Sequence, residues 1–378
     1  MLKELGQKNV NIPLTHKLWD MNWGFVLLIC ATASVGFLML YSAAGGNFEP
    51  WASRQMMRFG IGMMLMFVVA FVDIRIWLSL AYPLYAIALL LLVGVEVMGV
   101  IGMGAQRWIN LGPFQLQPSE VMKITLIMAL ARYFHNLGLE DTRRIQWLIV
   151  PILLVMAPAA LVLRQPDLGT ALLLVAGGGI VFFAAGVSLW KFGAVIGVAI
   201  PSGFFAYQFL HEYQKKRILT FLDPESDPLG AGYHILQSKI ALGSGGVFGK
   251  GLLHGTQSHL NYLPEMRTDF IFSMLAEEFG MVGGLLLFAL YVLLVLYGYA
   301  IAYRSRNHFG KLLAVGMTGV FFLYIFINAA MVMGLVPVVG VPLPLISYGG
   351  TAMLTLLIGF GLIMSVYLHR DIDIPGKR

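Results

Sequence analysis

Charged residues are scarce in this sequence. Only 12% of the 378 residues are Asp, Glu, Lys or Arg, whereas 58% are hydrophobic. Soluble domains carry about 25% charged and about 45–50% apolar residues. Together with a mean hydropathy of +0.80, this composition excludes an ordinary soluble enzyme and indicates a chain solvated mainly by lipid.

Cysteine is almost absent too. The single cysteine, Cys30, lies within the first apolar run. One thiol can form neither an internal disulfide nor a cysteine-based zinc site. We therefore interpret Cys30 as a small buried hydrophobic residue.

A basic stripe interleaved with aromatic residues is also missing. The net charge is +6, but the basic residues lie in short connections between apolar runs. This pattern argues against nucleic acid as a partner and fits the positive-inside rule of membrane proteins. The connections predicted to be cytoplasmic carry Lys3, Lys8, Lys17, Arg75, Arg132, Arg143, Arg144, Lys191, Arg304, Arg306, Lys311, Arg370, Lys377 and Arg378, and the short outer connections carry only Arg54, Arg58, Arg107 and Arg164.

Long apolar runs are abundant. A helix needs about 20 residues to cross a hydrocarbon core about 30 Å thick. We predict an all-α polytopic membrane protein with ten transmembrane helices, both termini in the cytoplasm and a single integral membrane domain over residues 1–378. The predicted spans lie near residues 23–42, 58–72, 77–98, 119–135, 147–163, 168–187, 190–210, 268–303, 311–334 and 351–369.

One large extracytoplasmic loop, residues 211–267, is expected between the seventh and eighth helices. Its glycine-rich stretch GSGGVFGKG resembles a phosphate loop, but that motif needs glycine at Ser244 and serine or threonine at Gly251. A long loop in a compact protein is usually functional or disordered. Apolar residues recur through this one, so we expect it to pack on the outer face.

The fourth span opens with QPSEVMKI, which places charge at the outer end of a membrane helix. Gln117 or Ser119 can cap this helix, and Glu120 in its first turn gains from the helix dipole. Lys123 lies three residues on, on the same face. The pair is either a structural ion pair that lets a lysine enter the membrane or an acid–base pair lining an outward cavity, and the spacing favours neither.

Two further polar stretches lie at outer ends of spans. Asp167 in RQPDLGT is a capping candidate for the sixth span, and with Arg164 and the nearby Arg107 of GAQRWINLG it brings charge to the outer face. The stretch PLPLISYGG, which contains Ser347 and Tyr348, is too rich in proline and glycine for a helix. Such backbone is tolerated at membrane depth only against protein or a wet cavity.

The eighth span begins with acidic residues, in the stretch TDFIFSMLAEEFG. Residues 268–303 would be about 54 Å long as one helix, well beyond the membrane core. Thr268 and Asp269 therefore lie at the outer surface or beside a recess beneath it, where Asp269 either caps the helix or faces the recess. Glu277 and Glu278 lie about two turns deeper and point about 100° apart, so we expect them to meet different partners.

These observations predict an outer recess lined by Asp269, Glu120, Lys123, Arg107 and Arg164. Such a recess suits a substrate with a lipid tail and a phosphate-bearing head. They name no reaction.

The same motifs carry a resemblance. GAQRWINLG, QPSEVMKI, QPDLGTA, the block from FLDPESDPLG to LAEEFG, and VVGVPLPLISYGG resemble the SEDS family (shape, elongation, division and sporulation). The likeness covers essentially the whole chain. The wording of PVVGVPLPLISYGG is closer to the elongation members than to the division members.

The resemblance implies a peptidoglycan glycosyltransferase in the bacterial cytoplasmic (inner) membrane. Such an enzyme polymerises lipid II into β1,4-linked strands at the periplasmic face during elongation. Its implied partners are a class B penicillin-binding protein, other elongation-complex proteins, lipid II and the undecaprenyl-linked glycan. The family's essential aspartate falls on Asp269 and its functional glutamate and lysine on Glu120 and Lys123.

The implied reaction inverts the anomeric carbon, because an α-linked donor gives a β1,4 bond. Asp269 is expected to act as the base on the acceptor hydroxyl. Arg107, Lys123 or Arg164 would offset charge on the undecaprenyl pyrophosphate leaving group. The sequence itself requires no cofactor and leaves a divalent metal, Mg²⁺ or Mn²⁺, open.

Two other classes of function remain at this stage. A lipid II flippase would need a polar route to the cytoplasmic face, whereas the polar residues gather outside. A structural scaffold for the cell-wall machinery would tolerate neutralisation of the charged recess.

Overall fold

The computed structural model describes residues 14–102, 105–110, 115–209, 215, 219–221, 223, 230–256 and 266–376. Lys3, Lys8, Lys377, Arg378 and much of the predicted loop 211–267 lie outside the described residues. What is described is mostly helical.

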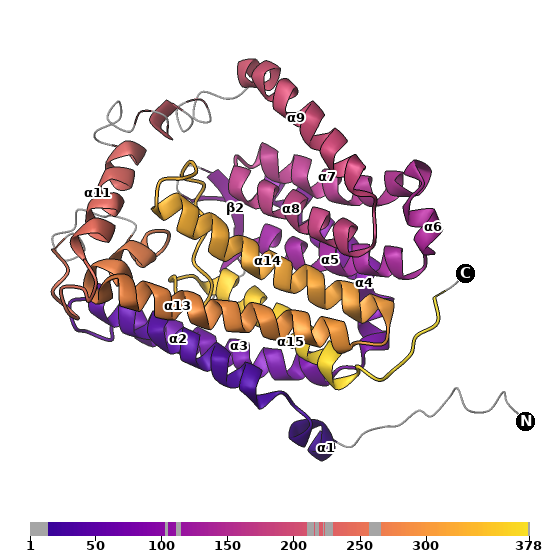
Figure 1. Ribbon diagram of the computed structural model, residues 1–378, viewed down its shortest axis with the longest axis horizontal. Coiled ribbons are helices and arrows are strands. Elements are labelled where there is room, and N and C mark those ends of the chain that lie inside the picture. The colour runs from indigo at the N-terminus through magenta and orange to yellow at the C-terminus, as the bar shows by residue number, and fades with distance from the viewer. Residues whose placement is uncertain are drawn as a thin grey trace, which may run out of the picture.

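Helices make up most of the fold (Figure 1). Lipid offers the backbone no hydrogen-bond partners, so an apolar segment that crosses it must form its backbone hydrogen bonds within itself. The helices are α1 (Leu14–Trp19), α2 (Trp23–Ala43), α3 (Ala52–Phe71), α4 (Ile74–Met98), α5 (Pro118–His135), α6 (Leu139–Thr142), the 3₁₀ helix η1 (Ile145–Leu148), α7 (Ile149–Arg164), α8 (Leu168–Ala184), α9 (Leu189–Phe209), α11 (Ala231–Ser244), α13 (Ile271–Arg304), α14 (His308–Val332) and α15 (Gly350–Leu368).

The described part of the chain holds seven helices that are long and apolar enough to cross a membrane. Each of the ten predicted ranges overlaps a helix, the other three being α5, α8 and α9. Helices α8 and α9 contribute only shorter apolar stretches, Leu168–Ala184 and Leu189–Val198. In α5 the polar residues Glu120, Lys123 and Arg132 interrupt the apolar pattern. The protein is thus a multi-pass membrane protein.

A small sheet corrects the all-α prediction. Strands β1 (Val100–Gly102), β2 (Ala105–Asn110) and β3 (Gln115–Leu116) pair antiparallel in the order β1-β2-β3. Trp108 pairs with Val100, and Ile109 pairs with Leu116. The stretch is too short and polar for a span, while its β-branched and aromatic residues suit a pleated sheet.

Helices α14 and α15 form the centre of the bundle. In their most apolar stretches 72% and 67% of the residues are buried, against 22–44% in the other five candidate spans. Helix α15 packs on α3, and α14 packs on α5, α8, α13 and α15. The outer helices leave many large apolar side chains exposed, as expected of surfaces that face lipid.

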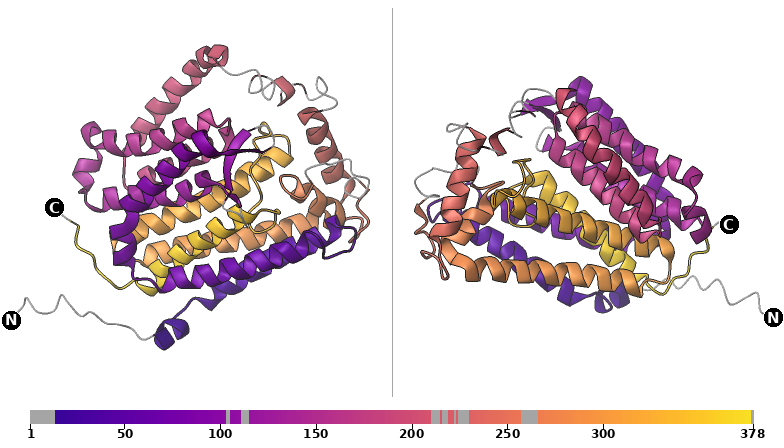
Figure 2. Two further views of the ribbon diagram at one scale, coloured as in Figure 1. Left: turned by 180° about the vertical axis from the view of Figure 1, so that it is seen from behind. Right: turned by 45° about the horizontal axis from the view of Figure 1, so that its top comes forward.

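The connections gather at two opposite ends of the bundle, as Figures 1 and 2 show. At one end α1 joins the ends of α3 and α15, because Lys17 donates to the carbonyl of Phe71 and lies 3.4 Å from His369. Arg132 and Lys191 bond to carbonyls of Ser79 and Arg143 at this same end. The other end holds the sheet, α11, the start of α13 and the segment before α15.

Helix α13 is broken near its start. Gly280 has φ 66° and ψ −161°, which is not helical. The break separates a half-helix, residues 271–279, from the long apolar part, and its position agrees with the length argument that set the first residues of this span apart. Figure 1 shows α11 beside this end of α13, so the long loop is not wholly irregular.

Candidate active site

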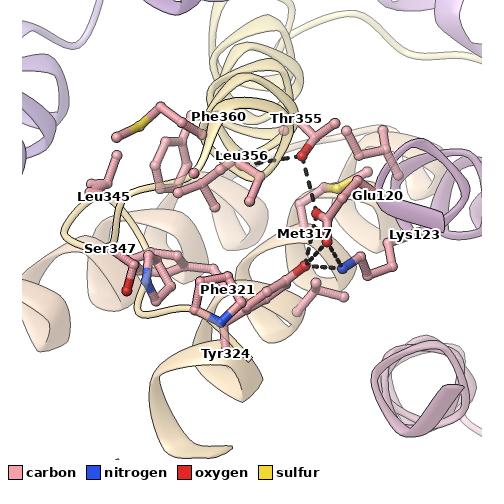
Figure 3. A pocket seen from close by; sticks show the side chains of 18 of the residues that line it. Glu120, Lys123, Met317, Phe321, Tyr324, Leu345, Ser347, Thr355, Leu356 and Phe360 are labelled. Atoms are coloured by element: carbon pink, nitrogen blue, oxygen red, sulfur yellow. Dashed lines mark hydrogen bonds and ion pairs between the residues drawn. The ribbon is translucent and has the colours of Figure 1, made fainter. Parts of the chain in front are cut away.

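A pocket opens among α5, α14, α15 and the segment that precedes α15. It encloses about 660 Å³, open solvent at its mouth included. Figure 3 shows Glu120, Lys123, Tyr324 and Thr355 gathered on one wall, with Ser347 apart from them and apolar side chains between. Its lining includes Glu120, Lys123, Met317, Phe321, Tyr324, Leu343, Ser347, Thr355, Leu356 and Phe360.

The polar wall is built around the carboxylate of Glu120. The ammonium of Lys123 lies 2.6 Å from Oε1 of Glu120, and the Tyr324 hydroxyl donates to the same carboxylate, with its oxygen 2.9 Å from Oε2. Thr355 Oγ1 lies 3.3 Å from Oε2, and Lys123 also donates to Tyr324. Glu120 and Lys123 are only 6% and 4% exposed, so each charge depends on the other and on these hydrogen bonds.

The start of α5 places the pair. Pro118 occupies the first turn, where a missing amide proton costs nothing. Gln117 stands at the N-cap but its side chain makes no capping bond, and Ser119 is buried in the first turn. Of the two predicted capping residues, Gln117 therefore holds the N-cap position, without a side-chain hydrogen bond.

Sequence reasoning missed Tyr324 and Thr355. Both lie in apolar helices distant in sequence from Glu120, and a hydroxyl in such a helix can bond its own backbone. Thr355 does so, donating to the carbonyl of Thr351. Only the packing of α5, α14 and α15 brings these hydroxyls to one carboxylate (Figure 3).

The irregular segment before α15 forms another wall. Ser347 Oγ accepts from the amide of Leu343 at 2.8 Å and donates to the carbonyl of Thr268 at 2.6 Å. Tyr291 donates to the carbonyl of Pro344, and Gln55 donates to the carbonyl of Ser347. Side chains from neighbouring helices thus form hydrogen bonds with backbone carbonyls of a segment that has no helical hydrogen bonds of its own.

Asp269 is half-buried and lies next to the segment before α15, which forms a wall of this pocket. The N-cap of α13 is Phe270, and its side chain forms no capping bond, so Asp269 does not occupy the capping position. Asn328 donates to the carbonyls of Asp269 and Val341, at 2.9 and 2.7 Å. A Cβ on Gly340 would lie 3.4 Å from Asp269 Oδ2.

The neighbours of Asp269 tie it to the pocket wall. The amide of Tyr348 donates to the carbonyl of Arg267 at 2.8 Å, next to the Ser347–Thr268 bond. Residues 267–269 therefore run along residues 340–348. Of the predicted site residues, Glu120, Lys123 and Ser347 line the pocket, whereas Asp269, Thr268 and Tyr348 do not. Thr268 and Tyr348 are tied to its wall by the two hydrogen bonds just described.

Arg107 and Asp167 serve another contact. Arg107 donates to the carbonyls of Gln165 and Pro166 and lies 3.8 Å from Asp167. Asp167 caps α8 by accepting from the amide and hydroxyl of Thr170, at 3.1 and 2.9 Å. These bonds fasten the sheet to the α7–α8 connection.

The predicted five-charge recess is therefore wrong in part. Neither Arg107 nor Arg164 lines the pocket; the first is held by the carbonyls just described, and the second is exposed at the end of α7. A Cβ on Gly169 would be 2.7 Å from the carbonyl oxygen of Val339, so the start of α8 lies against the segment before α15.

Arg58 is a cation that sequence reasoning noted only as an outer charge. Its guanidinium lies 4.8 Å from the centre of the Tyr348 ring, and a Cβ on Gly350 would lie 3.4 Å from its Nε. Its Nη1 is buried without a hydrogen-bond partner within the described residues. Arg58 thus places a positive charge beside the N-terminus of α15, whose dipole also favours anions.

The described residues contain no group of three or more His, Cys, Asp or Glu side chains that could hold a metal ion. We therefore assign no step to a metal.

Comparison with known proteins agrees with these features. The family model described as cell cycle protein, FtsW/RodA/SpoVE, matches residues 22–372. The peptidoglycan glycosyltransferase MrdB of Escherichia coli K12 is 43% identical over 366 residues, covering 95% of this chain and 97% of the relative.

Two solved structures are similar throughout. One chain of a peptidoglycan synthase complex that coordinates polymerization and crosslinking has a TM-score of 0.81 and 34% identity, covering 93% of this chain and 98% of its own. The rod shape determining protein RodA of Thermus thermophilus has a TM-score of 0.70 and 32% identity, with the same coverage. The chain belongs to the FtsW/RodA/SpoVE, or SEDS, family.

Proposed function

We propose that this protein is a peptidoglycan glycosyltransferase that polymerises lipid II into β1,4-linked glycan strands during cell elongation. The observation that carries the proposal is the half-buried Asp269 next to the wall of a pocket that holds the buried Glu120–Lys123 pair. Its E. coli relative is named for this activity.

The reaction joins a growing strand to a new lipid II molecule. The acceptor's 4-hydroxyl attacks the anomeric carbon of the strand, whose bond to undecaprenyl pyrophosphate breaks with inversion. Asp269 takes the hydroxyl proton as the attack proceeds. Asp269 is half-buried rather than enclosed in the core, as a residue that meets a substrate has to be.

Positive charge beside the pocket stabilises the leaving group. Lys123 is already bonded to Glu120 and Tyr324, so it contributes mainly through its field. Arg58 lies beside Tyr348 and the N-terminus of α15, so its charge also acts on the phosphates through its field. Arg107 and Arg164 are poorer candidates, given where their side chains lie.

The proposed topology follows from the two ends of the bundle. All ten predicted spans cross the cytoplasmic (inner) membrane as one domain, with both termini inside and the pocket facing the periplasm. The end that holds Arg132, Lys191 and Arg370 is the cytoplasmic one by the positive-inside rule. A class B penicillin-binding protein is the proposed partner, since one similar chain belongs to a complex that also crosslinks.

Reconstitution tests the function. The purified protein, with and without its transpeptidase partner, is placed in liposomes that carry labelled lipid II, and products are separated by length. Glycan strands are expected, whereas lipid II that only changes leaflet would replace the proposal with a flippase. Much of the pocket lining, including Met317, Phe321, Leu356, Phe360 and Ile363, is apolar, whereas a flippase needs a polar route, so the lining favours the glycosyltransferase.

A further inference from the structure

The glycine-rich stretch that resembled a phosphate loop completes the broken helix α13. In an unbroken helix, the amides of Met281 and Val282 would bond to the carbonyls of Glu277 and Glu278. Instead Met281 donates to the carbonyl of Gly246 at 2.9 Å, and Val282 to that of Val247 at 3.1 Å.

The other two groups freed by the break are satisfied by the same loop. The carbonyl of Glu277 accepts from the amide of Lys250 at 3.0 Å, and that of Glu278 from the amide of Gly251 at 2.9 Å. These four backbone groups beside the break at Gly280 thus find partners in residues 246–251. Residues 246–251 therefore replace the helical hydrogen bonds lost at the break, and we call this backbone contact the splice.

Glycine makes the splice sterically feasible. The backbone of the loop lies very close to α13. A Cβ on Gly245 would collide with the carbonyl of Ala276, and a Cβ on Gly249 would collide with the carbonyl of Glu278. A Cβ on Gly280 would collide with the amide of Gly249. Glycine is therefore needed at these positions because the loop backbone contacts the backbone of α13.

A side-chain cluster centred on the buried Glu277 covers this contact. Glu277 is 0% exposed, and its Oε1 lies 2.7 Å from the ammonium of Lys250 and accepts from the amide of Thr256 at 2.8 Å. Lys250 also donates to the hydroxyl of Thr256 at 2.8 Å. A carboxylate buried this deeply requires such compensation. We name Lys250, Thr256 and Glu277 the loop latch.

The loop latch lies at one end of the half-helix 271–279, and Asp269 lies just beyond the other end. The half-helix is about 13 Å long and stiff, so the position of its latched end affects the position of Asp269. The opposite end is held by the bonds from Asn328 and Ser347. Helix α11 supports the side, where Ser238 contacts Ser273 at 2.7 Å.

We propose that the loop latch positions Asp269 for glycosyl transfer by fixing the half-helix against residues 245–256. The inference rests on the proposed function of Asp269. Lys250, Thr256 and Glu277 are positioning residues, since they act through the half-helix and the backbone splice.

The first test is kinetic and uses the full-length protein with its partner. Glu277→Gln and Lys250→Met should each lower kcat for lipid II polymerisation at least about tenfold with little change in KM, because small misplacements of a catalytic group are costly. Lys250→Arg should recover most of the rate, since it keeps the charge and donors. The double variant Lys250→Met/Glu277→Gln should be no slower than the slower single variant.

Lys239→Met is the matched control, since this lysine is exposed on the neighbouring α11 and is outside the loop latch. It should keep the wild-type kcat. If Glu277→Gln fails to fold, Lys250→Met and Thr256→Val carry the test, because the Lys250 side chain is 28% exposed and Thr256 lies at the surface. Folded latch variants with wild-type kcat would overturn the inference.

The second test is independent of activity. In a Cys30→Ser background, the Asp269→Cys variant is reacted with a charged, water-soluble thiol reagent, with and without Lys250→Met. The latch substitution should change the reaction rate severalfold, whereas Lys239→Met should leave it unchanged. Equal rates would overturn the latch, while full activity of Asp269→Asn would instead overturn the proposed function.

Discussion

At the scale of single residues, the Glu120–Lys123 pair decides how the pocket wall is built. Both side chains are buried, the Tyr324 hydroxyl donates to the carboxylate, and the Thr355 hydroxyl lies 3.3 Å from it. Replacing one member leaves the other charge buried with weaker compensation. Such losses cost about 3–5 kcal/mol, whereas removing both charges is much milder.

We therefore expect Lys123→Met to destabilise the protein strongly and the double variant Glu120→Gln/Lys123→Met to regain part of the loss. Thermal unfolding of the detergent-solubilised protein measures both. Glu140→Gln, at an exposed position in α6, serves as the control and should lie within about 0.5 kcal/mol of the wild type. A single variant as stable as the wild type would contradict the buried-pair interpretation.

A second residue-scale prediction concerns His369, which follows the last residue of α15. Burial lowers the pKa of this histidine below its ordinary value of 6.5. The hydrogen bond to Ser365 and the charge of Asp73 raise the pKa, whereas the charges of Lys17 and Arg75 lower it. The neutral ring is thus favoured in the folded state. The contribution of His369 to the free energy of unfolding is fully present above the unfolded pKa. It is lost as the pH drops from about 6.5 toward the folded pKa.

The thermal midpoint of the wild type should accordingly fall between about pH 7.5 and about pH 5. His369→Gln removes the titrating group, so its midpoint should fall less over the same range. Parallel pH profiles for the two proteins would show that His369 contributes nothing to acid sensitivity.

At the scale of elements, the break in α13 is the most constrained backbone feature. Gly280 adopts φ 66° and ψ −161°, a region essentially restricted to glycine. Gly280→Ala adds this strain to a collision with the amide of Gly249 and should destabilise the protein by at least about 3 kcal/mol.

Gly179→Ala in α8 is the matched control. A Cβ there meets nothing within 4 Å, and alanine is the better helix former by up to about 1 kcal/mol. Its unfolding midpoint should equal or exceed that of the wild type. Equal stability of the two variants would mean that the splice places no demand on residue 280.

The helices and strands also show which parts of the fold can be predicted from sequence. Apolar length located ten helices, and the excess length of residues 268–303 set the start of that span apart, because hydropathy and helical rise are local properties. The break at Gly280 was not predicted, since its partners lie some thirty residues earlier in the chain. Nor was the sheet, whose strands are only a few residues long.

The site was predictable to the extent that its residues share a local motif. Glu120 and Lys123 are three residues apart, so helical geometry alone pairs them. Arg107 was assigned to the recess because charge at the same end of the bundle is all that sequence reveals, and the structure instead binds it to two carbonyls. Tyr324 and Thr355 depend on tertiary packing.

At the scale of the whole molecule, the account depends on which end of the bundle faces the periplasm. In a Cys30→Ser background, single cysteines introduced by Arg164→Cys and Asp371→Cys lie at exposed positions at opposite ends. A membrane-impermeant thiol reagent added to intact spheroplasts should label the first and not the second. The reverse pattern would place the pocket in the cytoplasm.

The central claim is that the carboxylate of Asp269, next to the pocket wall, performs the transfer. Its most direct test is the rate at which purified Asp269→Asn, with its partner, polymerises labelled lipid II in liposomes. Asp371→Asn, whose exposed carboxylate lies at the opposite end, is the control. We expect a loss of at least about 100-fold for Asp269→Asn with an unchanged unfolding midpoint, and wild-type strand synthesis by this variant would contradict the claim.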